Sequence, residues 1–283
     1  MTPVYLNGQF VARDQATISV FDRGFLFADG IYEVVAYFNR CAPFLAEHFA
    51  RLEQSCRAIS LPCPFDLSTF TSVVESLAQK ESSDDFLVYC QITRGAQPTR
   101  AHPIPEVIEP TVFVMTQSVP AFSIERLKRG FHAASVIENR WSRCDIKSVA
   151  LLANVLALQS AKMVDSEAVE AIYFADDILH EGASSAVMIV KEGVIQAPPD
   201  SHALLPSITR CTMQKLAHSL DIPFEAKQIT KNDVINADEI FIASASRILF
   251  PITKLDNQPV SNGEPGPIWL KLIQAFQKHL AQL

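Results

Sequence analysis

The sequence predicts an α+β fold in two domains, and three observations support it. The chain has 283 residues, of which 48% are hydrophobic, so it is long enough for two cores and apolar enough to fold compactly. Strand-like and helical patterns occur in blocks and do not alternate as in a doubly wound sheet. Residues 119–129 lack periodic apolar character. We therefore expect domains at residues 1–118 and 130–283, a linker at 119–129, and a functional site in the cleft between the domains.

The first domain is predicted to begin with a hairpin. Val4 to Val11 carries Asn7-Gly8 between short apolar runs, which is the signal of a type I′ turn. Runs of β-branched and aromatic residues then predict strands, and apolar residues at helical spacing predict helices. In chain order we expect a strand at Ile31–Phe38, helices at Ala46–Ile59 and Leu67–Gln79, and strands at Phe86–Thr93 and Thr111–Gln117, the last two joined by the polar loop Gly95–Pro110.

The second domain is predicted to mix strands and helices in the same way. In its first helix, Val149–Val164, Lys162 is the only charged residue, so we expect this helix to be buried on most faces. The other elements follow from β-rich runs bounded by turn residues and from helical spacing of apolar residues. They are strands at Phe131–Ile137, Ala168–Phe174, Ala186–Lys191 and Glu239–Ile242, and helices at Ile208–Leu220 and Pro267–Leu280.

Lys147 is the most informative single residue. It directly precedes the predicted helix, so the positive end of the helix dipole and burial both favour its neutral amine over the ammonium form. A neutral lysine amine attacks carbonyls, as in the Schiff base with the aldehyde of pyridoxal phosphate. Local physics leaves one alternative open, a lysine whose charged end reaches solvent beside the helix.

Four further segments extend the pattern around Lys147. They are Phe21-Asp22-Arg23-Gly24 with Asp29-Gly30-Ile31-Tyr32-Glu33, then Glu47-His48 with Arg51-Leu52, then His180-Glu181-Gly182-Ala183-Ser184-Ser185, and finally Leu204-Leu205-Pro206-Ser207-Ile208-Thr209-Arg210. In this order along nearly the whole chain, the five segments resemble the fold-type IV pyridoxal-phosphate enzymes (aminotransferase class IV). That group holds D-amino acid transaminases, branched-chain aminotransferases and aminodeoxychorismate lyases. The resemblance implies their two-domain fold, pyridoxal 5′-phosphate as cofactor, and Lys147 as the catalytic residue that binds it.

The resemblance also implies which residues contact the cofactor. Glu181 matches the glutamate that pairs with the pyridine nitrogen. Arg51 matches the arginine that binds the phosphate, a task that suits a guanidinium because it offers several donors and stays charged. Leu205 resembles the leucine packed on one face of the ring. The phosphate contacts that complete the set are the backbone amides of Ile208 and Thr209, at the start of a helix, with Ser244 and Ala245.

The loop Gly95–His102 separates the subfamilies. Its Arg100 and His102 look like the carboxylate trap of D-amino acid transaminases, where they would converge with Tyr32. Arg100 can bind a carboxylate bidentately, and His102 and the Tyr32 phenol can each donate one hydrogen bond. The resemblance thus implies transamination of D-amino acids, with D-alanine and 2-oxoglutarate giving pyruvate and D-glutamate. The alternatives are an aminodeoxychorismate lyase, a class IV aminotransferase for branched-chain or amine substrates, and a cofactor-binding protein that has lost catalysis.

Three positions depart from the family pattern. The family usually has Asn where this chain has Ala186, Gly where it has Ser207, and a hydroxyl residue where Ala245 follows Ser244. The loop with Arg100 and His102 is also one residue longer than in the D-amino acid transaminases. These changes concern phosphate anchoring and carboxylate geometry.

Composition argues against other classes of function. The net charge of −7, without a basic patch, makes nucleic acid a poor partner. The start of the chain lacks the pattern of a signal peptide, and no apolar run of about 18 residues suggests a membrane span, so we expect a cytoplasmic protein. The six cysteines have no C-x-x-C spacing and are expected to be free thiols, and no metal site is expected. Partners should be amino acid and 2-oxo acid substrates and, as the family implies, a second copy in a homodimer.

Overall fold

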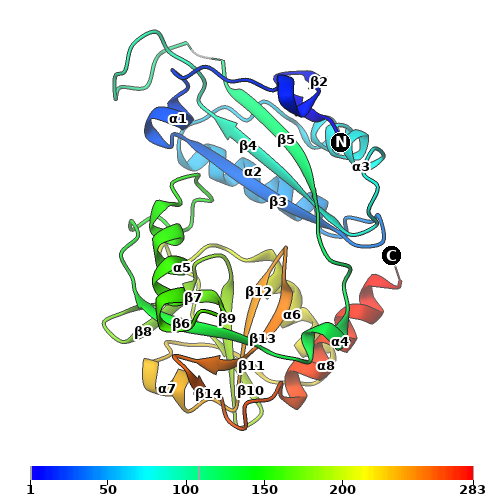
Figure 1. Cartoon of the computed structure of the whole chain (residues 1–283), viewed down its shortest axis with the longest axis vertical. Coiled ribbons are helices and arrows are strands. Elements are labelled where there is room, and N and C mark those ends of the chain that lie inside the picture. The colour runs from blue at the N-terminus through cyan, green and yellow to red at the C-terminus, as the bar shows by residue number, and fades with distance from the viewer. Residues whose placement is uncertain (1, 108, 283) are drawn as a thin grey trace. The chain divides into compact units, whose positions relative to one another are not determined.

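A computed structural model describes residues 2–107 and 109–282, which form two compact units (Figure 1). Unit 1 contains the residues up to Phe122 together with Ile146–Leu151, and unit 2 contains Ser123–Asp145 and the residues from Leu152 onward. The chain leaves unit 1 within the segment expected as a linker, where the short helix α4 (Ile124–Leu127) forms. Residues 146–151 differ from the expected domains because they return to unit 1, where Ser148 pairs with Ile31 in a β-bridge.

Unit 1 is built on a five-stranded antiparallel sheet with the strand order β2-β1-β5-β4-β3. The predicted hairpin is confirmed, and Asn7 and Gly8 both have positive φ angles, as a type I′ turn requires. The other predicted strands and helices of the first domain are also present, with ends within one residue of those expected. The elements are β1 (Val4–Leu6), β2 (Gln9–Val11), the 3-10 helix η1 (Arg13–Gln15), α1 (Arg23–Phe27), β3 (Gly30–Tyr37), α2 (Leu45–Ala58), α3 (Leu67–Ala78), β4 (Phe86–Thr93) and β5 (Thr111–Ser118).

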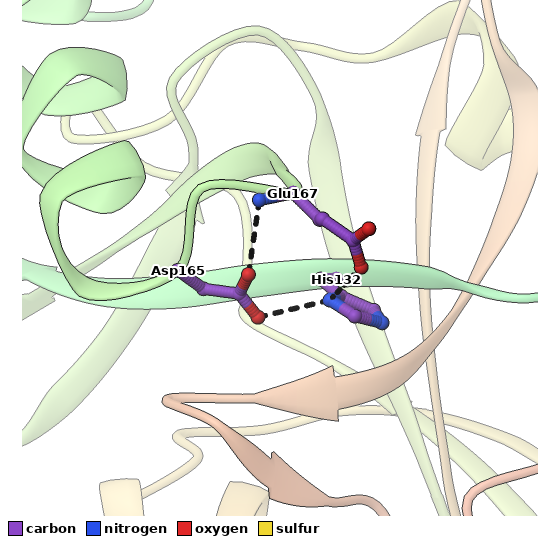
Figure 2. Close-up of side chains that lie close together, drawn as sticks. All are labelled: His132, Asp165 and Glu167. Carbon is purple, nitrogen blue, oxygen red and sulfur yellow. Dashed lines mark hydrogen bonds and ion pairs between the residues drawn. The ribbon is translucent and has the colours of Figure 1, made fainter.

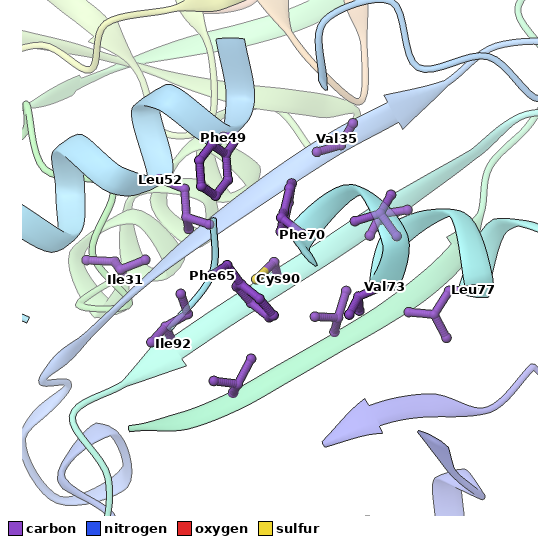
Figure 3. Close-up of a cluster of buried hydrophobic side chains, with 14 of the residues drawn as sticks. Ile31, Val35, Phe49, Leu52, Phe65, Phe70, Val73, Leu77, Cys90 and Ile92 are labelled. Carbon is purple, nitrogen blue, oxygen red and sulfur yellow. The ribbon is translucent and has the colours of Figure 1, made fainter. Parts of the chain in front are cut away.

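Helices α2 and α3 cover one face of this sheet, as Figure 3 shows. Phe49 and Leu52 of α2 and Phe70 of α3 meet strand residues such as Val35 in one buried cluster. In each helix the apolar residues recur every three or four positions, so one face is buried while the other carries polar side chains. This packing fixes α2 against β3.

Unit 2 is built on a mixed sheet with the strand order β11-β10-β9-β12-β13-β6-β7-β8, and β14 pairs with β13. Strand β6 runs parallel to both neighbours, whereas most other pairs are antiparallel. The elements are β6 (Phe131–Ile137), α5 (Leu152–Val164), β7 (Ala168–Ala175), β8 (Ile178–Gly182), β9 (Ala186–Lys191), β10 (Val194–Ala197), α6 (Ile208–Ser219), β11 (Phe224–Ala226), α7 (Lys231–Ile235), β12 (Glu239–Ser244), β13 (Ile248–Leu255), β14 (Gln258–Pro259) and α8 (Pro267–Leu280).

Helix α5 corrects two expectations. It begins at Leu152 and not at Val149, because the residues before it pair with β3. It is also not buried on most faces. Ala157 and Ala161 are its buried residues and pack against β6 and β7 through other small side chains. A second apolar face, formed by Leu152, Val155, Leu156 and Met163, is exposed. A helix with a single charged residue can therefore bury one narrow face and leave the other uncovered.

The C-terminal end of α5 is joined to β6 by three side chains, His132, Asp165 and Glu167 (Figure 2). Asp165 accepts a hydrogen bond from the backbone amide of Glu167 at 3.0 Å and lies 2.9 Å from Nδ1 of His132. The Glu167 carboxylate lies 3.5 Å from the same ring nitrogen. These are residue types that bind metals, but their contacts with one another suffice to explain the arrangement as a connection between α5 and the sheet.

Two further predictions can be checked against the fold. All six cysteines are free, as predicted. Among the described residues, no helix combines the length and the apolar character that a membrane span requires.

A buried carboxylate connects β3 to α2 in unit 1. Glu33 of β3 is inaccessible to solvent, and its two oxygens accept hydrogen bonds from Nη2 of Arg51 at 2.6 Å and from Nε at 2.9 Å. Nδ1 of His48 lies 2.9 Å from Oε1. Burial alone would raise the pKa of Glu33, but Arg51 and then His48 outweigh it and hold this pKa far below its usual value. Glu33 therefore orients Arg51.

Replacing Glu33 with Gln is expected to lower the free energy of unfolding at neutral pH by about 3–5 kcal/mol, because it removes the carboxylate that compensates a buried guanidinium. Since the pKa of Glu33 is lower in the folded protein than in the unfolded chain, this stabilisation is complete above about pH 4.3 and is lost as the pH falls further. Urea unfolding at neutral pH and at about pH 3.5 should therefore show a difference between the two proteins that shrinks in acid.

The control for this prediction is Glu125→Gln, which removes an exposed carboxylate paired with Lys128. It should change the free energy of unfolding by less than about 1 kcal/mol. Equal effects of the two substitutions at neutral pH would contradict the stabilising role of Glu33.

Candidate active site

Lys147 lies beside the start of β3 in unit 1. Its carbonyl accepts a hydrogen bond from the amide of Tyr32 at 2.9 Å, and its own amide donates to Oγ of Ser55 at 3.3 Å. The Lys147 Nζ lies 3.4 Å from the Tyr32 hydroxyl and 4.4 Å from the centre of the same ring. Tyr32 in turn stacks on Tyr89. The amine is thus held against a phenol whose ring is itself supported.

The expected cause of amine activation at Lys147 is wrong in one respect. Helix α5 starts at Leu152, so Lys147 does not lie in its first turn, and the effect of a helix dipole fades within about one turn. The lysine is also only partly buried. The immediate neighbour that the structure gives it is Tyr32.

Arg51, the residue expected at the phosphate, projects from α2 and is almost fully buried. Glu33 binds its Nε and Nη2 as described above, which fixes the plane of the guanidinium. The sequence alone had not indicated a role for Glu33. The available signal was a charged residue inside a strand of apolar residues, which is buried only when it is paired.

Arg100 and His102 meet around one aromatic ring. The guanidinium carbon of Arg100 lies 4.8 Å from the centre of the Phe27 ring, and the His102 ring lies 5.3 Å from it. Both residues are exposed. Within the described residues, no hydrogen bond or ring contact joins Tyr32 to either of them. The structure therefore brings Arg100 and His102 together at Phe27, and Tyr32 together with Lys147.

Glu181 of β8, in unit 2, has defined partners for both carboxylate oxygens. Oε1 accepts from Nη1 of Arg140 at 2.7 Å, and Oε2 accepts from the amide of Leu205 at 3.0 Å. The residue is buried. This hydrogen bond joins two residues to which the resemblance assigns neighbouring roles. Glu181 is expected at the ring nitrogen of the cofactor, and Leu205 is expected on one face of the same ring.

Arg140 is a site residue that sequence reasoning missed. It pairs with Glu138 at 2.6 Å as well as with Glu181, and its guanidinium lies 4.2 Å from the centre of the Tyr173 ring. Burial alone would lower the pKa of Arg140, but Glu138 and Glu181 outweigh it and raise this pKa. Likewise, burial alone would raise the pKa of Glu138, but Arg140 holds it below its usual value. Arg140 therefore carries a positive charge that fixes Glu181.

The N-terminus of α6 follows Leu205 after two residues. Ser207, which stands where the family usually has glycine, is the N-cap, and its hydroxyl accepts from the amide of Arg210 at 3.1 Å. Ile208 and Thr209 form the first turn, whose amides have no acceptor within the helix. Their role in anion binding stays a prediction, and the departure at Ser207 supplies a cap.

The remaining predicted residues lie on two neighbouring turns. Ser184 and Ser185 donate to one oxygen of Glu170, at 2.9 and 2.7 Å, and Arg247 donates to the same oxygen at 2.6 Å. Ser244 ends β12, and its hydroxyl lies 3.4 Å from that of Ser246. Ala245 starts the turn between β12 and β13, and Ala186 starts β9 beside it. The hydroxyl that Ala245 lacks is therefore present one position later, at Ser246.

Comparisons with known proteins identify the family of the chain. The family model described as "Amino-transferase class IV" matches residues 30–255. The chain is 36% identical over 281 residues to D-alanine aminotransferase of Staphylococcus aureus (strain MSSA476), covering 99% of this chain and 98% of that protein. It is 34% identical over 277 residues to D-alanine aminotransferase of Bacillus licheniformis, covering 98% and 96%.

Solved structures show the same fold. The branched-chain amino acid aminotransferase of Escherichia coli superposes with a TM-score of 0.89 at 21% identity, covering 98% of this chain and 93% of that chain. The branched-chain aminotransferase of Thermoproteus uzoniensis gives a TM-score of 0.84 at 23% identity, covering 98% and 94%. With a family model over most of its length and relatives above one third identity from end to end, the chain belongs to the class IV aminotransferases.

Proposed function

We propose that this class IV aminotransferase uses pyridoxal 5′-phosphate to transaminate D-amino acids, moving the amino group of D-alanine to 2-oxoglutarate. The observation that carries the proposal is the 34–37% identity, over nearly the full length of both chains, to proteins named D-alanine aminotransferase. The Arg100 and His102 pair in the Gly95–His102 loop supports the same substrate class.

The residues present fit the cofactor by their chemistry. Pyridoxal phosphate, when bound, supplies an aldehyde that condenses with amines and a ring that accepts electrons. Lys147 offers the amine, and Glu181 offers a carboxylate for the ring nitrogen, fixed at both oxygens by Arg140 and Leu205. The phosphate would be held by the residues that can donate to an anion, namely Arg51, the amides of Ile208 and Thr209, and the Ser244–Ala245 turn. Leu205 would pack against the ring.

Lys147 also has a second task. When its amine is not bound to the cofactor, the Nζ of Lys147 would act as a base that removes the α-proton of the substrate, and the resulting ammonium would then act as the acid that gives this proton back. The Tyr32 hydroxyl, 3.4 Å from Nζ, restricts the positions of the amine during this transfer. Arg100 would bind the substrate carboxylate with two parallel hydrogen bonds, and His102 would add a third.

We also propose that the protein is a homodimer that uses α5. Leu152, Val155, Leu156 and Met163 are separated by one or two helical turns and form an exposed apolar stripe on a helix whose opposite face packs against its own sheet. Lys162 is the only charged side chain on this helix. An apolar stripe can be covered by the same stripe of a second copy, because an interface related by a twofold axis uses the same surface on both subunits. The cytoplasmic location stays a prediction of the sequence.

Replacing Lys147 with Ala should abolish transamination, because no other residue of the site offers an amine to the cofactor aldehyde. The purified wild-type protein is tested against a panel of D- and L-amino acids with 2-oxoglutarate, and the variant against the best donor. Lys162→Ala, an exposed lysine on α5, is the matched control and should retain wild-type rates. Turnover by Lys147→Ala, or a preference for L-amino acids in the wild type, would refute the respective part of the proposal.

Glu181→Gln should retain cofactor but slow the half-reaction with D-alanine by roughly tenfold or more, because a neutral amide stabilises a protonated ring nitrogen less than a carboxylate does. Single-turnover absorbance after mixing with D-alanine measures this rate directly. Glu192→Gln, in an exposed turn, serves as control. An unchanged rate in Glu181→Gln would remove Glu181 from the mechanism.

Leu156→Glu should convert the protein from dimer to monomer, because it places a charge in the centre of the apolar stripe. Ser72→Glu adds the same charge to an exposed position of α3, away from the stripe, and should leave the dimer intact. Sedimentation velocity distinguishes the two masses. The proposed interface is wrong if Leu156→Glu sediments like the wild type.

A further inference from the structure

The segment Phe21-Asp22-Arg23-Gly24, with Asp29 after it, matches the family, yet none of the roles proposed above uses Asp22, Arg23 or Asp29. Asp22 caps the short helix α1, since its Oδ1 accepts from the amide of Gly24 at 2.7 Å. Its Oδ2 accepts from the hydroxyls of Thr93 and Thr111, at 3.0 and 2.6 Å. A side chain at Gly24 would collide with Thr93. These contacts fix α1 against the ends of β4 and β5, where the loop from Gly95 begins.

Arg23, the first residue of α1, points its buried guanidinium at that loop. Nη1 donates to Oε1 of Gln97 at 3.0 Å, to the carbonyl of Ala101 at 2.7 Å and to that of Pro103 at 3.3 Å. Nη2 donates to the carbonyl of His102 at 3.1 Å. The Arg23 side chain therefore binds three consecutive backbone carbonyls, those of Ala101, His102 and Pro103.

The Arg23 guanidinium is also bound by a carboxylate on the side that faces away from the loop carbonyls. Nε of Arg23 donates to Oδ2 of Asp29 at 2.7 Å, and Arg94 binds both oxygens of Asp29 at 2.8 and 3.0 Å. Burial alone would raise the pKa of Asp29, but Arg94 and Arg23 outweigh it and lower this pKa. One carboxylate compensates only one of two buried guanidinium groups. The remaining positive charge is therefore stabilised by backbone carbonyls, which for Arg23 are those of the loop.

The last residue of α1 positions the two loop side chains. The Phe27 ring lies 5.0 Å from the guanidinium carbon of Arg23, 4.8 Å from that of Arg100, and 5.3 Å from the His102 ring. Arg23 thus binds the loop backbone, and Phe27 contacts its Arg and His side chains. Both come from one helical segment of five residues.

We infer that Arg23 is a positioning residue for substrate carboxylate recognition, which holds the loop from Gln97 to Pro103 in the conformation that presents Arg100 and His102. This inference rests on the proposed role of Arg100. Arg23 itself would not contact the substrate. A loop of polar residues and prolines has few apolar contacts to order it, and a carboxylate site that is ordered beforehand binds more tightly because less conformational entropy is lost on binding.

The test is Arg23→Lys in the holoenzyme. Lysine keeps the charge next to Asp29, but a single ammonium cannot reach all four acceptors of the loop. The KM for D-alanine should rise about tenfold, while kcat changes by less than about twofold, because binding is affected and the proton transfer at Lys147 is not. Trypsin, which cleaves after Arg100, should cut the loop faster in the variant.

Arg40→Lys is the matched control. Its guanidinium, like that of Arg23, donates to several backbone carbonyls, but these belong to Ala78, Glu81 and Ser83, outside the loop. Arg40→Lys should leave KM and the trypsin rate unchanged. Phe27→Leu is a second variant, for use if Arg23→Lys fails to fold. It leaves the buried ion pairs intact and is also expected to raise the KM.

The double variant Arg23→Lys/Arg100→Leu separates the two proposals. Arg100→Leu alone should raise the KM by about tenfold or more, and Arg23→Lys should add much less in that background than in the wild type, because only His102 is left for the loop to present. The inference is overturned if Arg100→Leu raises the KM and Arg23→Lys does not, or if Arg23→Lys and Arg40→Lys have equal effects. An unchanged KM in Arg100→Leu would instead refute the role of Arg100, and the trypsin rate would then decide whether Arg23 holds the loop.

Discussion

Two backbone hydrogen bonds between β3 and a short piece of distant chain determine the candidate site of unit 1. The amide of Tyr32 donates to the carbonyl of Lys147, and the amide of Val149 donates to the carbonyl of Gly30. Because residues alternate sides along a strand, this register brings Lys147 and Tyr32 together and places Glu33 of the next position under α2. A shift by one residue would exchange the roles of Tyr32 and Glu33. The chemistry proposed for the amine thus depends on ordinary β-sheet pairing.

Carboxylate–arginine pairs recur around the candidate site residues. In each pair an arginine binds a carboxylate from a different segment of the same unit, and at least one of the two side chains is buried. The pairs are Glu33–Arg51, Asp29–Arg94, Glu181–Arg140 and Glu170–Arg247. Buried ion pairs add little net stability compared with apolar side chains, but they fix the orientation of both groups. A site that must aim charged side chains at a small ligand gains from such fixed orientation.

Local sequence patterns predicted most helices and strands of the fold, but some elements were not predicted. The hairpin at Asn7-Gly8 and the strand Phe131–Ile137 follow from turn chemistry and β-rich composition, and both are present. Strand β13 was not predicted, and its Ile248 has a positive φ angle while Pro251 interrupts its pattern. Helix α7 was missed although Thr230 and Asp233 form a capping box that the sequence displays.

The site residues divide in the same way. Lys147, Arg51 and Glu181 were predicted as candidates because they stand in segments that resemble a family, and not because their neighbours were known. Arg140 could not be assigned to Glu181, 41 residues away, before the sheet of unit 2 brought β8 to it. The expectation of a buried α5 failed because composition does not distinguish an apolar face packed inside the chain from one left outside.

Helix α5 carries small side chains toward its own sheet and large ones toward solvent. If a second copy covers the large ones, part of the apolar burial that stabilises unit 2 exists only in the assembled state, and the folding equilibrium then includes protein concentration. Dilution alone would lower the temperature of unfolding, without any change in sequence or solvent. Newly made chains would also pass through a period in which this stripe is exposed, so the rate of encounter between copies would set how long they are open to aggregation.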